Sequence, residues 1–104
     1  MGLFKSDPDK ELAKAIAKRG VSGRATVVDM REGEGGRHEF TLELNGVRCR
    51  VSQRMNAYTL HGIAPGEPLS VMYDREDPSR VIIMGHASYR VTEHGVVRVE
   101  DVQT

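Results

Sequence analysis

The chain has 104 residues, which is enough for one domain with a single core, and it is 38% hydrophobic with only 5% aromatic residues. A large substrate cleft is disfavoured, because clefts form between layers or domains that so short a chain lacks. The formal net charge is zero, which argues against a dedicated nucleic-acid binder, whose domain is usually strongly basic.

Cysteine content and hydropathy indicate the cellular compartment. Cys49 is the only cysteine in the sequence, so an intrachain disulfide is impossible and a reducing compartment is favoured. The sequence contains no run of 18 apolar residues, and its first residues lack the apolar core of a signal peptide. These features predict a cytoplasmic protein with no transmembrane segment.

Residues 1–20 are predicted to form an N-terminal amphipathic helix, ahead of a small β-barrel domain at residues 21–104. Asp7 can cap the helix and Pro8 suits its first turn, while Gly20 favours its end. Two faces run along it, one apolar and one cationic. They consist of Leu12, Ala15 and Ile16 on one side and Lys10, Lys14 and Lys18 on the other.

The two faces leave two roles open for this helix. Its apolar stripe can pack over an open end of the barrel, or its lysines can hold it on an anionic membrane surface as a peripheral contact. Residues 1–24 carry six basic side chains against three acids, so the helix favours an acidic partner in either case.

A hairpin is predicted at residues 37–52. Two segments that alternate apolar and polar residues flank Asn45-Gly46, a pair that favours a two-residue type I′ turn because both positions need a positive φ. This turn fixes the register and puts every apolar pair on one face, so a slip of one residue would bury the charges. The predicted pairs are Leu44 with Val47, Leu42 with Cys49 and Phe40 with Val51.

The rest of the chain also reads as short strands and turns. Further strands are predicted at residues 24–31, 69–73 and 80–84, whereas residues 54–62 fit a helical turn or an irregular crossover. Residues 87–99 can form a last hairpin, inside or outside the barrel. The predicted fold class is mostly β: a small antiparallel barrel of five to seven strands, OB- or SH3-like, with the N-terminal amphipathic helix in front.

The sequence carries no catalytic, cofactor-binding or metal-binding signature. Its histidines lack ligand spacing, and we expect each to be solvated or singly hydrogen-bonded: His38, His61, His86 and His94. Asp74, Glu76 and Asp77 lie close together, but aspartates in such a turn cap their own backbone without a metal. Cys49 lies on the apolar face of a strand, where we expect a small buried hydrophobe with a raised pKa. We therefore predict no enzyme and no cofactor.

Three arginines on the polar face of the predicted hairpin suggest an alternative. Arg48, Arg50 and Arg54 could contact the phosphates of an oligonucleotide on a barrel surface. Such a site also needs exposed aromatic rings, and only Tyr58 or Tyr89 could serve, because Phe40 is committed to the core face. Two glutamates on the same polar face would repel a phosphate backbone.

Two sequence blocks resemble a known kind of domain. Residues 23–27 (GRATV) and 65–78 (PGEPLSVMYDREDP) resemble small all-β domains of unknown function that are common in actinobacterial proteins. The resemblance covers roughly residues 21–84 and implies an opening strand and a closing strand-turn, with no catalytic residues. Such domains often adjoin transmembrane helices or an oligomerisation helix, and Arg75 stands here where their first turn proline is usual.

These observations predict a non-enzymatic interaction or accessory module of a bacterial cytoplasmic protein assembly, with a protein partner. The alternatives are an oligonucleotide-binding barrel and a peripheral membrane-surface protein. The candidate partner-binding residues are the cations of the helix and of the hairpin: Lys10, Lys14, Lys18, Arg48, Arg50 and Arg54.

Overall fold

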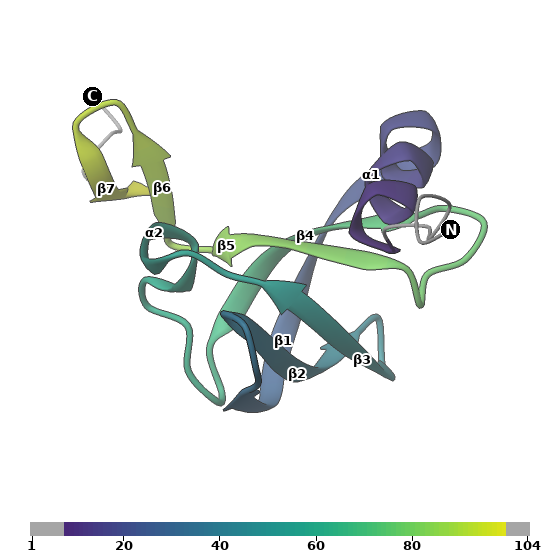
Figure 1. Cartoon of the computed structure of the whole chain (residues 1–104), viewed down its shortest axis with the longest axis horizontal. Helices are drawn as coiled ribbons and strands as arrows, with labels where there is room; N and C mark the ends of the chain where they lie inside the picture. Colours follow the sequence, from purple (N-terminus) through teal and green to yellow (C-terminus); the bar gives the residue numbers. More distant parts are fainter. Residues whose placement is uncertain (1–7, 100–104) are drawn as a thin grey trace.

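The computed structural model describes residues 8–99, which form two helices and two antiparallel sheets (Figure 1). In chain order the elements are α1 (Pro8–Arg19), β1 (Gly20–Glu32), β2 (Arg37–Leu44), β3 (Val47–Arg54), α2 (Ala57–Leu60), β4 (Pro68–Asp74), β5 (Val81–His86), β6 (Tyr89–Thr92) and β7 (Gly95–Arg98). The first five strands form one sheet in the order β3-β2-β1-β4-β5, and β6 pairs with β7 in a second. The fold is mostly β with a leading helix, as predicted.

β1 is longer than predicted from the sequence. The prediction started the strand too late because two glycines, which often interrupt strands, lie inside it. The strand expected at residues 24–31 extends over Gly20–Glu32. A side chain at Gly20 would clash with the carbonyl oxygen of Ile16, and a Cβ at Gly23 would lie 2.8 Å from a tyrosine ring of β4. These glycines therefore permit close packing of the strand against its neighbours.

The predicted hairpin of β2 and β3 forms in the predicted register. Asn45 and Gly46 have φ angles of 53° and 80°, as a type I′ turn requires. Leu44, Leu42 and Phe40 pair with Val47, Cys49 and Val51. Most of the hairpin's apolar face is buried in the core, but Cys49 is half-buried and Val47, at the tip, is exposed.

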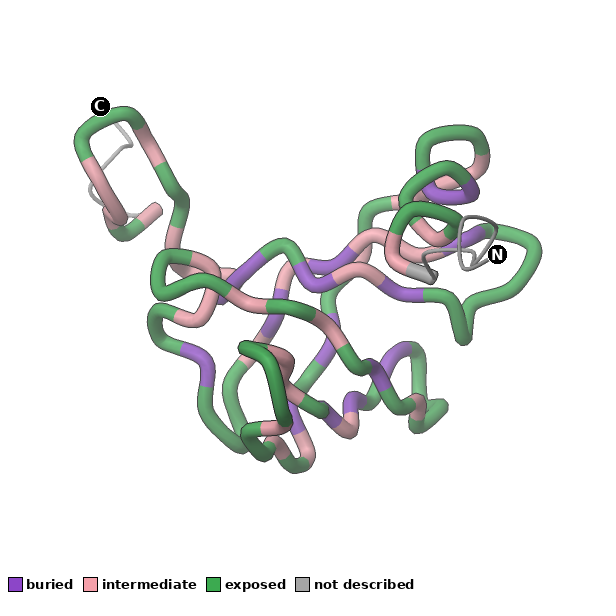
Figure 2. Tube along the Cα trace, viewed as in Figure 1, coloured by how far each residue is buried: buried purple, intermediate pink, exposed green. Residues whose placement is uncertain are grey.

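The core lies within the curl of the five-stranded sheet. It includes residues from all five strands, among them Val27, Phe40, Val51, Leu69 and Ile83. Figure 2 shows buried positions along this sheet and on α1, whereas β6 and β7 carry exposed and half-buried residues. The last hairpin therefore contributes little to the core.

The edge strands of the large sheet, β3 and β5, approach each other without pairing. Gln53 donates from Nε2 to the carbonyl oxygen of Ile83 at 3.0 Å and accepts at Oε1 from the Ile83 N–H at 2.8 Å. One side-chain amide thus occupies backbone groups that a neighbouring strand would use. The sheet is not closed by a backbone ladder between β3 and β5, so the predicted OB- or SH3-like barrel is not confirmed.

Helix α1 packs its apolar stripe on the sheet, which is the first of the two roles left open for it. Ala15 and Ile16 are 9% and 8% exposed. Arg19, its last residue, donates to both carboxylate oxygens of Asp74 at 3.0 and 2.8 Å. This bidentate pair joins the end of the helix to the end of β4. Asp7, the predicted cap, lies outside the described residues.

The last two strands, drawn in yellow tones in Figure 1, form a separate hairpin that projects from the sheet. The hairpin predicted in residues 87–99 therefore exists, and it does not join the five-stranded sheet. Its base is held by backbone bonds from the Val99 N–H to the Ser88 oxygen at 2.8 Å and from the Ala87 N–H to the Pro68 oxygen at 3.1 Å.

Candidate binding surfaces

The three lysines of α1 are exposed and form no ion pair with any residue in the range 8–99: Lys10, Lys14 and Lys18. The apolar residues Ala15 and Ile16 of the same helix are buried against the sheet. Within the described part of α1, a membrane surface would therefore be held mainly by charge. Neither described helix has the length and apolar character needed to cross a bilayer.

The three arginines of β3 are also exposed, as the alternation predicted. Acidic groups interrupt their surface, since Glu43 lies directly opposite Arg48. Two more carboxylates line a depression of about 240 Å³ that Arg50 borders. Phe40, the aromatic residue of that depression, is only 2% exposed, so it offers no face on which a base could stack.

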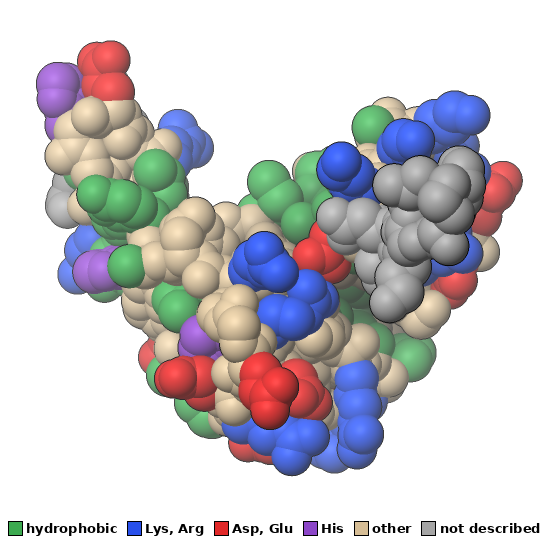
Figure 3. All heavy atoms as spheres, viewed as in Figure 1, with side chains coloured by type: hydrophobic (Ala, Val, Ile, Leu, Met, Phe, Trp, Pro, Cys, Tyr) green, Lys and Arg blue, Asp and Glu red, His purple; other side chains and the backbone are tan. Residues whose placement is uncertain are grey.

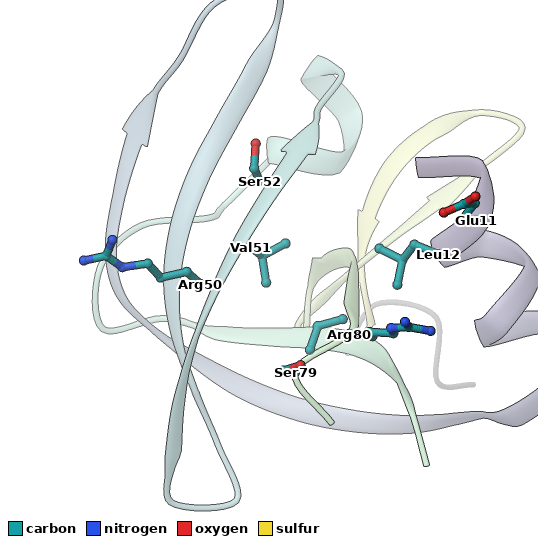
Figure 4. Close-up of a pocket in the computed structure, with 8 residues that line it drawn as sticks. Glu11, Leu12, Arg50, Val51, Ser52, Ser79 and Arg80 are labelled. Atoms are coloured by element: carbon teal, nitrogen blue, oxygen red, sulfur yellow. The ribbon is translucent and has the colours of Figure 1, made fainter. Parts of the chain in front are cut away.

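A groove of about 300 Å³ lies between α1 and the β3 and β5 edges, and Figure 4 shows it in close-up. Leu12 and Val51 lie across the opening from each other, and the guanidinium of Arg50 points away from it. Glu11 and Arg80 also line the groove, so its charge is mixed.

The acidic side of α1 faces the β2–β3 hairpin. Asp9 forms an ion pair with Arg37 at 3.0 Å, and the hydrogen bond from that guanidinium lowers the pKa of Asp9. The groove of mixed charge lies between α1 and the part of β3 that carries Arg50. Arg54, in contrast, lies close to Asp9 of α1.

A second groove lies at the base of the projecting hairpin, and we call it the hairpin groove. Its volume is about 410 Å³, and it is lined by the outer face of β1, β4 and β5, by α2 and by the β6–β7 hairpin. Tyr58, Met84 and Val91 line it and are 59%, 55% and 55% exposed. Figure 3 shows hydrophobic side chains gathered on this hairpin and at its base.

The charge of the hairpin groove has one sign. Arg24 and Arg90 line it, and none of the lining residues within 8–99 is Asp or Glu. Neither arginine forms an ion pair with any residue in the described range 8–99. Within the described part of the chain, the groove thus combines exposed apolar surface with two arginines that have no acidic partner.

A histidine and a tyrosine fix the base of the hairpin. His86 is 7% exposed; its Nδ1 accepts from the Ser88 N–H at 3.0 Å, which leaves Nε2 to donate to Glu67 at 2.9 Å. The ring of Tyr89 packs edge-on against His86 and covers Gly62, where a Cβ would lie 2.6 Å from that ring. The expectation that each histidine is solvated or singly bonded is wrong for His86, because the turn after β5 buries it between two partners.

Other predicted chemistry has a structural explanation. In the part of the chain that the structure describes, no three of His, Cys, Asp and Glu gather where they could hold a metal ion. Asp74 and Asp77 cap their own turns, accepting from the N–H groups of Glu76 and Ser79 at 2.9 and 3.2 Å. Cys49 is half-buried rather than fully buried, and burial raises the pKa of its thiol as predicted.

Comparison with known proteins adds no assignment: neither the protein-family models, nor the curated proteins, nor the solved structures gave a match to this chain. The resemblance seen at residues 23–27 and 65–78 stays a prediction. The hairpin groove was not found from the sequence, because Tyr58, Met84 and Val91 come from α2, β5 and β6 and share no periodic pattern.

Proposed function

We propose that this protein is a non-catalytic module that binds another protein through the hairpin groove. One observation carries the proposal: of the four large hydrophobic residues that stand out as exposed within residues 8–99, three line this single groove. Exposed apolar residues scattered over a surface need no explanation, but a contiguous cluster in a hollow is typical of an interaction site.

The proposal keeps the cytoplasmic location that the single cysteine favours. It also treats the five-stranded sheet as a barrel-like scaffold, in which Gln53 links the edge strands β3 and β5. The other two roles considered for the cationic residues have weaker support. Oligonucleotide binding would need stacking surfaces beside the β3 arginines. Membrane docking would need apolar residues beside the lysines, and the described part of α1 exposes no large hydrophobic residue there.

Site-specific photocrosslinking tests the proposal. A photoreactive amino acid replaces Met84 or Val91 in the groove, and Val47 serves as the matched control because it is equally apolar and 65% exposed at the tip of the other hairpin. We expect the same protein to be captured from low-salt extract at both groove positions and not at Val47. The captured protein, once purified, should bind the unmodified chain. Capture of it from Val47 as efficiently as from Met84, or no capture at the groove positions, would contradict the proposal.

A further inference from the structure

We propose that the hairpin groove takes an extended segment of the partner protein, in which apolar and acidic residues alternate, and that this segment pairs with the free edge of β6. The inference rests on the proposed function and specifies the chemistry of the partner.

The small size of the β6–β7 hairpin and the open edge of β6 indicate an extended ligand. Within residues 8–99 the hairpin is a two-stranded sheet of four residues per strand, and such a ribbon is marginally stable in water on its own. No other strand within residues 8–99 pairs with the edge of β6 that faces away from β7, so the backbone groups of that edge can accept a further strand. Tyr89, Arg90 and Val91, three consecutive residues of β6, line the groove. A segment in the groove therefore lies beside β6 and can add a third strand to the hairpin.

The apolar side chains of the groove set the first requirement on this segment. Met84, Val91 and Tyr58 are exposed and come from three different elements, so they offer contacts on several sides of a ligand. Met84 has an unbranched thioether side chain that adapts to different ligand shapes. Because alternate side chains of a strand point to one face, apolar residues at every second position would meet these three contacts.

The charge of the groove sets the second requirement. Arg24 lies on β1 and Arg90 on β6, so the two cations stand on different walls of the groove. Among the residues that the structure describes, the lining has no carboxylate and neither arginine forms an ion pair, so both can bind carboxylates of a ligand. A basic segment would be repelled. Acidic residues between the apolar ones complete the complementary pattern.

Selection from a random peptide library tests this inference on the full-length chain. We expect the selected peptides to alternate Val, Ile, Leu or Phe with Asp or Glu. The double variant Arg24→Glu/Arg90→Glu should bind the best of them about tenfold more weakly or worse, because each lost ion pair is replaced by a repulsion. The control double variant Arg48→Glu/Arg50→Glu makes the same charge change on β3 and should leave the affinity within about twofold.

Other outcomes overturn the inference and separate it from the proposed function. A consensus without acidic residues, no consensus, or equal binding by the Arg24→Glu/Arg90→Glu variant would show that the ligand chemistry is wrong. If photocrosslinking at Met84 still captured one protein, the proposed function would stand without it. The sequence of residues 99–102 (VEDV) has the same acidic and apolar character, so Glu100→Lys/Asp101→Lys is a further control. Tighter peptide binding by that variant would assign the groove to the chain's own C-terminus instead of a partner.

Discussion

The two hairpins of this protein follow the same rules of chain geometry but differ in how far their apolar side chains are buried. The β2–β3 hairpin buries its apolar face, with Phe40 and Leu42 2% and 0% exposed. The β6–β7 hairpin also pairs in register across a tight turn, but Val91 is 55% exposed and its other valines are only half-buried. Alternation and a turn specify a hairpin, and whether its apolar side chains become core or binding surface depends on what covers them.

The coverage comes from residues far away in the chain. β2 and β3 are covered because β1 bends and pairs with β2 through one half and with β4 through the other. β6 and β7 follow the turn at His86, which leads the chain away from the sheet. The difference separates a part of the molecule that provides stability from a part that is available for binding.

Removing one core side chain from the first hairpin should have the largest effect. Phe40→Ala should lower the free energy of unfolding by about 3–5 kcal/mol, because it leaves a cavity in the core. The matched change in the second hairpin, Val91→Ala, should cost about 0.5 kcal/mol or less. Urea unfolding of both variants measures the difference, and similar losses would show that the β6–β7 hairpin belongs to the core.

Acid should weaken the main sheet through Asp74. The Arg19 guanidinium and backbone N–H groups hold the pKa of this carboxyl well below its ordinary value of 3.8. Since the folded pKa is the lower one, the stabilisation is complete above the unfolded value and is lost as pH falls below about 3.8. Asp74→Asn should be less stable at pH 7 and lose less on acidification. Thermal unfolding between pH 7 and pH 2 measures this, and parallel curves for variant and parent would refute the role of the pair.

Turn glycines should distinguish global from local unfolding. Gly46 has a φ of 80° and Gly95 a φ of 117°, so valine strains the backbone at both positions. Gly46→Val should lower the free energy of unfolding of the whole domain by about 1 kcal/mol or more. Gly95→Val should release the β6–β7 hairpin and leave the midpoint of urea unfolding nearly unchanged. An unchanged midpoint of urea unfolding for Gly46→Val would contradict the assignment of a type I′ turn at Asn45-Gly46.

The smallest predicted effect concerns a reaction rate. Cys49 is half-buried beside the core, and burial raises the pKa of its thiol, so little thiolate is present at neutral pH. A thiol reagent should label the native protein more slowly than the urea-denatured protein. Equal rates would mean that this part of β3 opens freely, which would remove the contrast between the two hairpins.

The sequence predicted those features whose causes are local. The Asn45-Gly46 turn and the alternation around it define the register of β2 and β3 completely, since a two-residue turn leaves no freedom to slip. The limits of α1 follow equally from Pro8 and Gly20. These elements needed no knowledge of the tertiary structure.

The features that were missed depend on contacts between distant residues. Arg19 and Asp74 are 55 positions apart, and Gln53 binds the backbone of Ile83 30 positions away. Neither pairing leaves a periodic signal. The hairpin groove was missed for the same reason, because an exposed methionine on β5 is recognisable as part of a site only once β6 lies beside it.

Hydrogen exchange of the backbone amides, with and without a bound partner segment, tests the central claim most directly. In the free protein, we expect the β6 and β7 amides to exchange through local opening, well before those of β2. A bound peptide or captured partner should slow exchange at residues 89–91 and leave β3 and α1 unchanged. Protection that appears at β3 or α1 without any change at β6 would contradict the assignment of the hairpin groove as the binding surface.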